Sequence, residues 1–274
     1  MSLTHEQLLM RRKGIGASEV AAAIGLSAFD KGPLNVWTDK VLGREEDEAP
    51  NIRRDFGHRV EGFIGLTLYP EDTGLETAAY GHTIVGPEEW ILATPDFVVL
   101  RGDERGLLDA KNTGERMSPH WGESGEYEEW RQGICPFDYY AQLQWQGVCW
   151  KQETGKTPAF LDLGVLLGGF DFRVLRFPYD ALVVEGMIDA ARVFFREYVL
   201  TGKQPPVDGS ASATKLLRRI YPEAKLPMMR ATDAECPLLD RLVAAKHWRR
   251  EAEKEEEEAA AAVQAAIGER QGLF

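Results

Sequence analysis

The pattern of hydrophobic and polar positions predicts a central run of strands with helices before and after it. Apolar residues recur every three or four positions in the helical stretches, and they alternate or form short unbroken runs in the strands. The predicted helices are 4–9, 19–24, 33–42, 54–69, 139–150, 179–201 and 238–267, and the predicted strands are 80–85, 90–94, 97–101, 106–111, 159–167 and 170–177. This order predicts an α/β or α+β fold, in which helices flank a mixed central sheet.

The composition changes beyond Pro222, where the sequence becomes a single long helical pattern with the low-complexity run EKEEEEAAAAVQAA. We therefore predict two parts, a domain over residues 1–222 and an acidic, alanine-rich helical extension over residues 223–274. The simplest interpretation of the acidic helix is a solvated surface. A helix that binds a partner is the alternative.

Composition limits the class of protein without identifying it. The chain has 274 residues, 44% of them hydrophobic, and no run of eighteen apolar residues, so we expect no membrane segment and no signal peptide. Its three cysteines, Cys135, Cys149 and Cys236, are widely spaced and odd in number, which predicts no disulfide framework and a reducing, cytoplasmic location. The net charge of −12 disfavours broad binding to nucleic acid, although a local cleft can be basic or hold metal ions.

Candidate chemistry is concentrated in ILATPDFVVLRGDERGLLDAKNTG, residues 91–114. Asp96 falls between two predicted strands, and Asp109 and Lys111 are two residues apart, hence on one face of the next strand. Two carboxylates can hold Mg²⁺ or Mn²⁺, and the backbone carbonyl of Ala110 can add an oxygen. A lysine beside such ions can orient a metal-bound water, so the group suits hydrolysis of phosphodiesters.

A plainer interpretation of the same residues is a turn aspartate and a surface ion pair, because a PD…DxK pattern is short and its gap is loose. Glu61, on a predicted helix, has the same two interpretations. It is either a further carboxylate for the site or a solvated glutamate on a helix face.

Several motifs in order resemble those of one family. They are RRKGIGASEVAAAIGLSAFDKGPLNVW, GHRVEG, ATPDFVV, LLDAKN, CPFDYYAQLQWQG and DFRVLRFPYDALVVEGMIDAARVFFREYVLTGKQPP. Together they resemble the YqaJ-like viral recombinase family, also called the phage lambda exonuclease family, within the PD-(D/E)xK nucleases. The resemblance implies a restriction-endonuclease-like core and an exonuclease domain over residues 1–222. It fades beyond Pro222, so it leaves the helical extension unexplained.

Carried over residue by residue, the resemblance implies a role for each residue of the motifs. Asp96, Asp109, the carbonyl of Ala110 and Glu61 become ligands of two Mg²⁺ or Mn²⁺ ions, and Lys111 becomes the residue that positions the attacking water. Asp109 stands where the family more often has glutamate, which shortens the carboxylate arm by about one methylene.

Further residues are implied for the substrate. Arg12 with Ser18 becomes the grip on a terminal 5′-phosphate, with Arg11 as the alternative arginine, because a guanidinium and a hydroxyl near a helix start suit phosphate. Gln142 and Gln144 become groups near the site that orient ligands or contact DNA.

The activity implied is a metal-dependent exonuclease on the free ends of double-stranded DNA. It would digest from 5′ to 3′, release mononucleotides and leave a 3′ single strand for a single-strand annealing protein. The family also implies a homo-oligomeric ring, commonly a trimer, and a bacterial or phage-infected cell as the location. Two alternatives stay open, a structure-specific or nicking endonuclease and a DNA-binding module without catalysis.

Overall fold

The computed structural model describes residues 10, 12–43, 52–207, 209–221, 223, 228, 230–233 and 235–268, of which 52–55, 58 and 219 are described by backbone alone. The chain divides into two compact units, Met1–Ile220 and Tyr221–Phe274. The predicted helix at 4–9 lies outside the described residues, as does Arg11. The assignment of an exonuclease domain to residues 1–222 stays a prediction.

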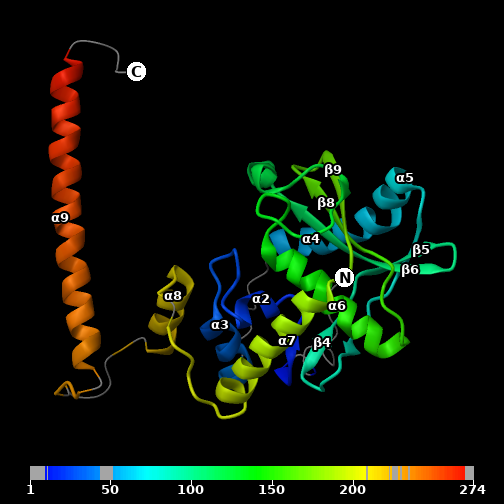
Figure 1. Cartoon of the computed structure of the whole chain (residues 1–274), viewed down its shortest axis with the longest axis horizontal. Helices are drawn as coiled ribbons and strands as arrows, with labels where there is room; N and C mark the ends of the chain where they lie inside the picture. Colours follow the sequence, from blue (N-terminus) through cyan, green and yellow to red (C-terminus); the bar gives the residue numbers. More distant parts are fainter. Residues whose placement is uncertain are drawn as a thin grey trace. The chain divides into compact units, whose positions relative to one another are not determined.

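A six-stranded mixed sheet forms the centre of the first unit (Figure 1). Across the sheet the strands are β2 (Glu76–Ala79), β5 (Phe97–Arg101), β6 (Glu104–Thr113), β8 (Leu161–Leu167), β9 (Asp171–Phe177) and β7 (Gly125–Glu126). The β6–β8 and β7–β9 pairs are parallel and the others antiparallel. The β8–β9 hairpin turns at Gly168 and Gly169, which both have positive φ, as the turn of a tight hairpin requires. The two strands predicted at 159–167 and 170–177 therefore form a hairpin.

A second, three-stranded sheet leads into the first. It consists of β1 (Ile15–Gly16), β4 (Ile91–Ala93) and β3 (Ile84–Val85), with β1 and β4 parallel. The chain approaches closely here, because a Cβ on Gly14 would lie 2.3 Å from the carbonyl oxygen of Trp90, and Ile15 donates its N–H to that oxygen at 2.7 Å. β4 and β5 belong to different sheets, so Thr94–Asp96 is a crossover between them.

Helices cover both faces of the main sheet, because its central strands are apolar on both sides. One face packs against a large core that includes α6 (Phe137–Thr154), α7 (Ala181–Phe194) and the short helices near the N-terminus. The opposite face packs against one nearly continuous helical segment, α4 (Ile52–Phe63), η2 (Ile64–Leu68) and α5 (Tyr69–Thr73). The remaining helical segments of this unit are α2 (Val20–Ala23), α3 (Pro33–Trp37), η1 (Thr38–Gly43), η3 (Glu115–His120), η4 (Phe195–Val199) and α8 (Ala211–Ile220). This is the predicted mixed sheet flanked by helices.

A buried ionic cluster fixes α5 on the sheet. Asp162, on β8, is fully buried and accepts hydrogen bonds from the Tyr69 hydroxyl and from Arg176 Nε (2.8 Å) and Nη2 (2.7 Å). The Arg176 guanidinium also lies 4.0 Å from the centroid of the Phe160 ring. Burial raises the pKa of the Tyr69 hydroxyl, which keeps it a donor. The cluster therefore ties the end of the α4–η2–α5 segment to the middle of the sheet.

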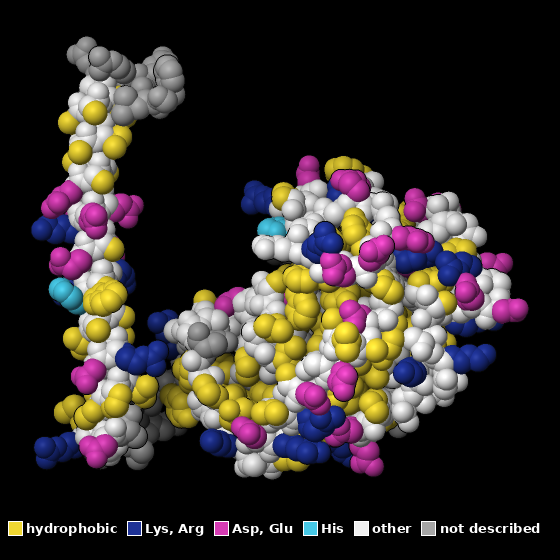
Figure 2. All heavy atoms as spheres, viewed as in Figure 1, with side chains coloured by type: hydrophobic (Ala, Val, Ile, Leu, Met, Phe, Trp, Pro, Cys, Tyr) yellow, Lys and Arg dark blue, Asp and Glu magenta, His cyan; other side chains and the backbone are white. Residues whose placement is uncertain are grey.

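The second unit contains α9 (Cys236–Ile267), the long C-terminal helix that the sequence predicts. None of its residues is buried, and acidic and basic side chains cover much of its middle part (Figure 2). Among the described residues, no helix combines the length and the apolar character needed to cross a membrane.

Candidate active site

Asp109 and Lys111 form an ion pair on the face of β6 that packs against α6. Their spacing places both side chains on one side of the strand, as the sequence predicts. Asp109 is fully buried, whereas the Lys111 side chain is 19% exposed, and its Nζ contacts Asp109 Oδ2. The ammonium group therefore reaches from the surface to a carboxylate that solvent does not touch.

Two glutamines of α6 hold the other oxygen of the same carboxylate. Gln142 and Gln146 both donate from Nε2 to Asp109 Oδ1, at 2.6 Å and 2.9 Å. They are four residues apart and so share a face of the helix. Gln146 was missed in the sequence, although its spacing from Gln142 is the signal that identifies it.

Gln144, which the resemblance implies near the site, makes its hydrogen bonds elsewhere. It is fully buried, its Nε2 donates to the carbonyl of Pro178 at 2.8 Å, and its Oε1 accepts from the N–H of Asp180 at 2.9 Å. Two residues along a helix turn a side chain to a different face, so Gln144 links α6 to the start of α7.

Asp96 meets β6 just beyond the end of its pairing with β5. The last residue pair there is Phe97 with Leu108, and Asp96 Oδ2 accepts a hydrogen bond from the N–H of Ala110 at 3.2 Å. In a strand, the N–H and C=O of one residue point to the same side. The carbonyl of Ala110 therefore projects toward the side of β6 where Asp96 lies.

Burial and the neighbouring carboxylates raise the pKa of Asp96. Burial, then the charge of Asp109 and finally that of Glu61 raise the pKa of Asp96 to about 7, against the opposing effect of Lys111. Burial alone would lower the pKa of Lys111, but Asp109 and Asp96 raise it above its ordinary value. The lysine is therefore an ammonium ion at neutral pH, and the acidic group carries more negative charge than one lysine neutralises.

Glu61 approaches from the α4 side of the sheet and is half-buried. Its helix continues as the wider turn η2, where a Cβ on Gly65 would lie 2.3 Å from the ring of Phe97. The carbonyl of Gly65 accepts a hydrogen bond from the Thr77 hydroxyl of β2. The absence of a side chain at Gly65 thus sets how closely α4 approaches the strand that follows Asp96, and so where Glu61 lies.

Aromatic side chains line the solvent side of Lys111. Its Nζ lies 5.3 Å from the ring centroid of Tyr139, whose ring stacks on Trp121 at 5.4 Å and meets Phe29 edge-on at 5.5 Å. Trp121 is 4% exposed, so it forms a wall behind Tyr139 and not a wedge for a duplex end. Tyr140 and Trp145 are buried in the core, so neither is available to stack on a base.

The segment that carries Arg12 and Ser18 is joined to the strand leading to Asp96, because β1 pairs with β4. Arg12 and Ser18 are both exposed. The expected helix at 19–24 is shorter, Val20–Ala23, and its N-cap is Glu19 and not Ser18. Glu19 accepts from the N–H of Gly16 at 2.8 Å and forms an ion pair with Lys40 at 2.8 Å.

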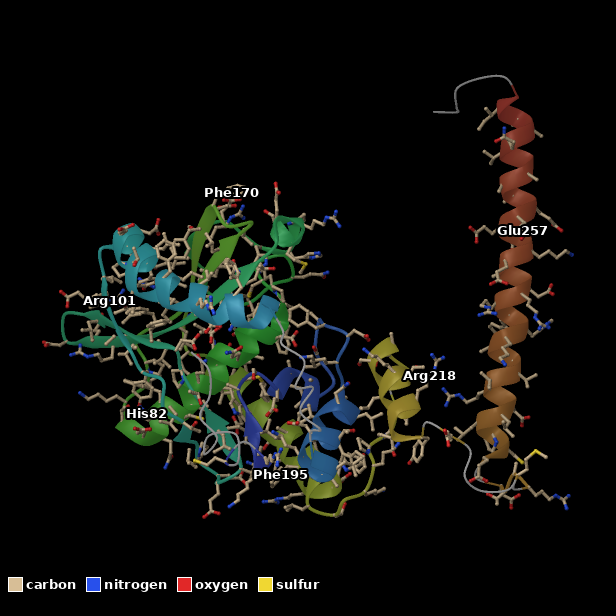
Figure 3. The ribbon with its side chains drawn as sticks, turned by 180° about the vertical axis from the view of Figure 1, so that it is seen from behind. His82, Arg101, Phe170, Phe195, Arg218 and Glu257 are labelled. Carbon is tan, nitrogen blue, oxygen red and sulfur yellow. The ribbon has the colours of Figure 1, made fainter. Side chains whose placement is uncertain are left out.

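The oxygen atoms of this site are of the kind that Mg²⁺ and Mn²⁺ prefer. Among the described residues, no three His, Cys, Asp or Glu side chains are already arranged as a metal site. Asp109 Oδ2 faces the Lys111 ammonium, and burial together with the neighbouring carboxylates raises the pKa of Asp96. A divalent cation would relieve the repulsion among these carboxylates, so the residues fit such an ion. Figure 3 shows the molecule from behind and labels Arg101, the last residue of β5. Asp96 directly precedes the first residue of β5, so the proposed metal ligands lie at the opposite end of that strand.

The chain is similar to known proteins in sequence and in fold. The model of the YqaJ-like viral recombinase domain matches residues 6–156. The chain is 27% identical over 222 residues to the uncharacterized protein YqaJ of Bacillus subtilis (strain 168), covering 80% of this chain and 64% of that protein. It therefore spans less than two thirds of the length of this relative.

Two solved structures are similar. A putative exonuclease from Eubacterium rectale has a TM-score of 0.53 at 13% identity, covering 84% of this chain and 97% of that chain. The alkaline exonuclease LHK-Exo from Laribacter hongkongensis has a TM-score of 0.49 at 18% identity, covering 81% of this chain and 100% of that chain. At these identities, the similarity to the Eubacterium rectale protein establishes a common fold.

Proposed function

The chain belongs to the YqaJ-like viral recombinase domain family, and from this we propose that it is a metal-dependent nuclease that degrades double-stranded DNA from its ends. One observation carries the proposal. Asp96, Asp109 and Lys111 meet at the end of the β5–β6 pairing, although they come from a crossover and a strand. Two acids and an ammonium in one half-buried place suit phosphodiester hydrolysis better than they suit packing.

The metal site would be made of oxygen atoms from three elements. Asp96 and Asp109 would be the main ligands of Mg²⁺ or Mn²⁺, with the carbonyl of Ala110 and, for a second ion, Glu61. When bound, such ions lower the pKa of water and neutralise the negative charge that develops on the phosphate. Gln142 and Gln146 would keep Asp109 in place, since both hold Oδ1 and leave Oδ2 for the centre of the site.

Lys111 would act as a donor. Its raised pKa keeps the proton on Nζ, so it would hydrogen bond to the attacking water or to a phosphate oxygen instead of removing a proton. Tyr139 and the Trp121 wall behind it restrict the directions in which the ammonium can turn. This positions Nζ at the boundary between the buried acids and the solvent, where a DNA strand can reach.

The family resemblance supports the finer part of the proposal. Arg12 and Ser18, or Arg11 in place of Arg12, would bind the 5′-phosphate of the strand being digested, so that mononucleotides leave in the 5′-to-3′ direction. A homo-oligomeric ring, commonly a trimer in the family, would enclose DNA with its acidic surface outside and metal ions inside. This would accommodate the net charge of −12. The remaining 3′ single strand would pass to a single-strand annealing protein.

The test compares DNA substrates that differ only in their ends. Purified protein is incubated with Mg²⁺ and linear duplexes, with and without 5′-phosphates, and with closed circular duplex. We expect release of mononucleotides from the linear forms, faster with the 5′-phosphate, and no cutting of the circle. Cutting of the circle would identify an endonuclease. No cleavage with Mg²⁺ or Mn²⁺ would leave a DNA-binding module and overturn the proposal.

A further inference from the structure

Helix α9 exposes apolar side chains that its own unit does not cover. Leu238, Leu242 and Val263 are each at least 50% exposed, and of the residues in α9 only Ile267 is half-buried. Leu239, Val243 and Trp248 are exposed as well, and exposed apolar side chains along one helix indicate a surface that another element can bury.

One side of α9 has the spacing of a coiled-coil seam, alternating between four and three residues. We call these positions the α9 seam: Leu238, Leu242, Ala245, Arg249, Ala252, Glu256, Ala259, Val263 and Ala266. All are apolar except Arg249 and Glu256, which have opposite charges. Leucines occupy one end of the seam and alanines most of the other, so a large residue can face a small one if two such helices run in opposite directions.

The two charged residues decide the direction of pairing. Arg249 lies three residues before the middle of the seam at Ala252, and Glu256 lies four residues after it. Two parallel copies would bring Arg249 against Arg249 and Glu256 against Glu256 within the seam. Two antiparallel copies bring Arg249 of each helix close to Glu256 of the other, which removes the repulsion between like charges.

The charges outside the seam follow the same symmetry. Residues 241–250 contain four Lys or Arg and no acid, whereas residues 251–258 contain six Glu and one Lys. Figure 2 shows acidic side chains gathered on the middle of the helix, with hydrophobic ones toward its ends. Glu257, labelled in Figure 3, projects from this acidic segment. Antiparallel pairing centred on Ala252 places the basic segment of each copy along the acidic segment of the other.

We propose that α9 pairs in antiparallel orientation with α9 of a second copy of this chain. The charge reversal at the middle of the helix makes the surface complementary to itself, so a second copy fits it without any further partner. The proposal does not depend on the nuclease activity, because none of the residues of the candidate active site belongs to α9.

Cross-linking between cysteines distinguishes the orientations in the full chain. Cys236 is the only exposed cysteine among the described residues, since Cys135 and Cys149 are buried, so Cys236→Ser provides a suitable background. In that background we compare Ala252→Cys, Ala245→Cys alone, and Ala245→Cys together with Ala259→Cys, using a short bifunctional maleimide. Positions 245 and 259 are about 21 Å apart along one helix, which such a reagent does not span.

We expect Ala252→Cys and the Ala245→Cys/Ala259→Cys pair to give covalent dimers, because each joins positions at equal distances from the middle of the seam. Ala245→Cys alone should give little product, because the two copies of position 245 lie at opposite ends of an antiparallel pair. Efficient cross-linking of Ala245→Cys alone would show parallel helices. Absence of product from all three would show that α9 does not pair with itself. Either result would overturn the proposal.

Charge variants in the Ala252→Cys background test the seam itself. We expect Arg249→Glu to reduce the yield of covalent dimer about tenfold and Arg249→Glu with Glu256→Arg to restore it. Lys254→Glu is the control, because it changes the charge equally and lies outside the seam. Each change also breaks one exposed ion pair within the helix, Arg249–Glu253 at 3.3 Å or Lys254–Glu258 at 3.6 Å. Equal losses in Arg249→Glu and Lys254→Glu, or no recovery in the swap, would refute the pairing.

Discussion

Gln146 and Asp109 form a hydrogen bond of 2.9 Å between two side chains that are both fully buried. The bond joins α6 to β6 and involves the Asp109 oxygen that does not contact Lys111. Gln142 reaches the same oxygen from the next turn of the helix. The orientation of the catalytic carboxylate in the proposed site is therefore set from the α6 side of the sheet.

Substitutions of Gln146 and Gln144 distinguish an effect on the proposed site from an effect on the stability of the fold. We expect Gln146→Leu to reduce the cleavage rate at least tenfold, because Asp109 loses a fixed donor and can rotate away from the productive position. The loss of one buried bond to a charged acceptor costs about 1.5–3 kcal/mol. Gln144→Leu is the control, since it removes bonds to Pro178 and Asp180 and should lower the melting temperature with little change in the rate per folded molecule. Equal rate losses in both variants would contradict a positioning role for Gln146.

Removal of the lysine tests the chemistry and the electrostatics together. Lys111→Ala should abolish cleavage and retain DNA binding, as measured by a gel-shift titration of duplex ends. It should also destabilise the metal-free protein by about 3–5 kcal/mol, because Asp109 is then buried without a cation. Asp109→Asn with Lys111→Met should recover much of that stability and none of the activity. Full activity of Lys111→Ala would remove the lysine from the mechanism.

The strands of the site were predictable because their signal is local. The aromatic and β-branched residues at 97–99 predict a strand over 97–101, and β5 has those bounds. Alternation along β6 was enough to place Asp109 and Lys111 on one face. In contrast, β2 (Glu76–Ala79) was missed, because it is an exposed edge strand of short polar and small residues that pairs only through tertiary context. The predicted strand at 80–85 is shorter in the structure, Ile84–Val85, and Gly81 within the predicted range has a positive φ that a strand does not adopt.

The contacts between elements that are distant in the sequence could not be predicted from the local pattern of hydrophobic and polar residues. The sequence predicts Asp96 between two strands, but its bond to the Ala110 N–H depends on the β5–β6 pairing stopping at Phe97 and Leu108, which leaves that N–H without a strand partner in β5. Likewise, the choice between Gln144 and Gln146 depends on which face of α6 meets β6. The i, i+4 spacing of Gln142 and Gln146 contained that information, whereas a motif of alternate glutamines did not.

The raised pKa of Asp96 gives the metal-free protein a defined pH dependence. The carboxyl group takes up a proton on folding between its ordinary pKa near 4 and about 7, so its contribution to stability is largest at low pH and is lost as the pH rises through 7. We expect Asp96→Asn, measured with a chelator present, to raise the melting temperature at pH 8 by about 2–4 °C per kcal/mol regained. At pH 5 the gain should be smaller.

The same group predicts how metal ions stabilise the protein. Mg²⁺ or Mn²⁺ must displace the proton from Asp96, so the ions should raise the melting temperature of the wild type more at pH 8 than at pH 6. Asp96→Asn should remove most of this increase, because a neutral amide is a weaker ligand than a carboxylate. A metal-induced increase of equal size in Asp96→Asn would show that the ions bind elsewhere.

Gly65 offers a test of how the sheet positions Glu61, with a matched control on the same helical segment. A Cβ at Gly65 would lie 2.3 Å from the buried ring of Phe97, whereas a Cβ at Gly62 would meet no atom within 4 Å. Gly65→Ala must therefore lift the end of α4 from the sheet or displace Phe97, at a cost of about 1–3 kcal/mol. Gly62→Ala should be neutral or stabilise the helix by up to about 1 kcal/mol. Urea unfolding of the metal-free proteins measures both changes in the free energy of unfolding.

Because Phe97 directly follows Asp96, the displacement caused by Gly65→Ala should also lower the affinity for Mn²⁺ in a calorimetric titration. Gly62→Ala should leave that affinity unchanged. An unaltered Mn²⁺ affinity in a Gly65→Ala protein that is measurably destabilised would show that the helix and its Glu61 carboxylate are not part of the metal site.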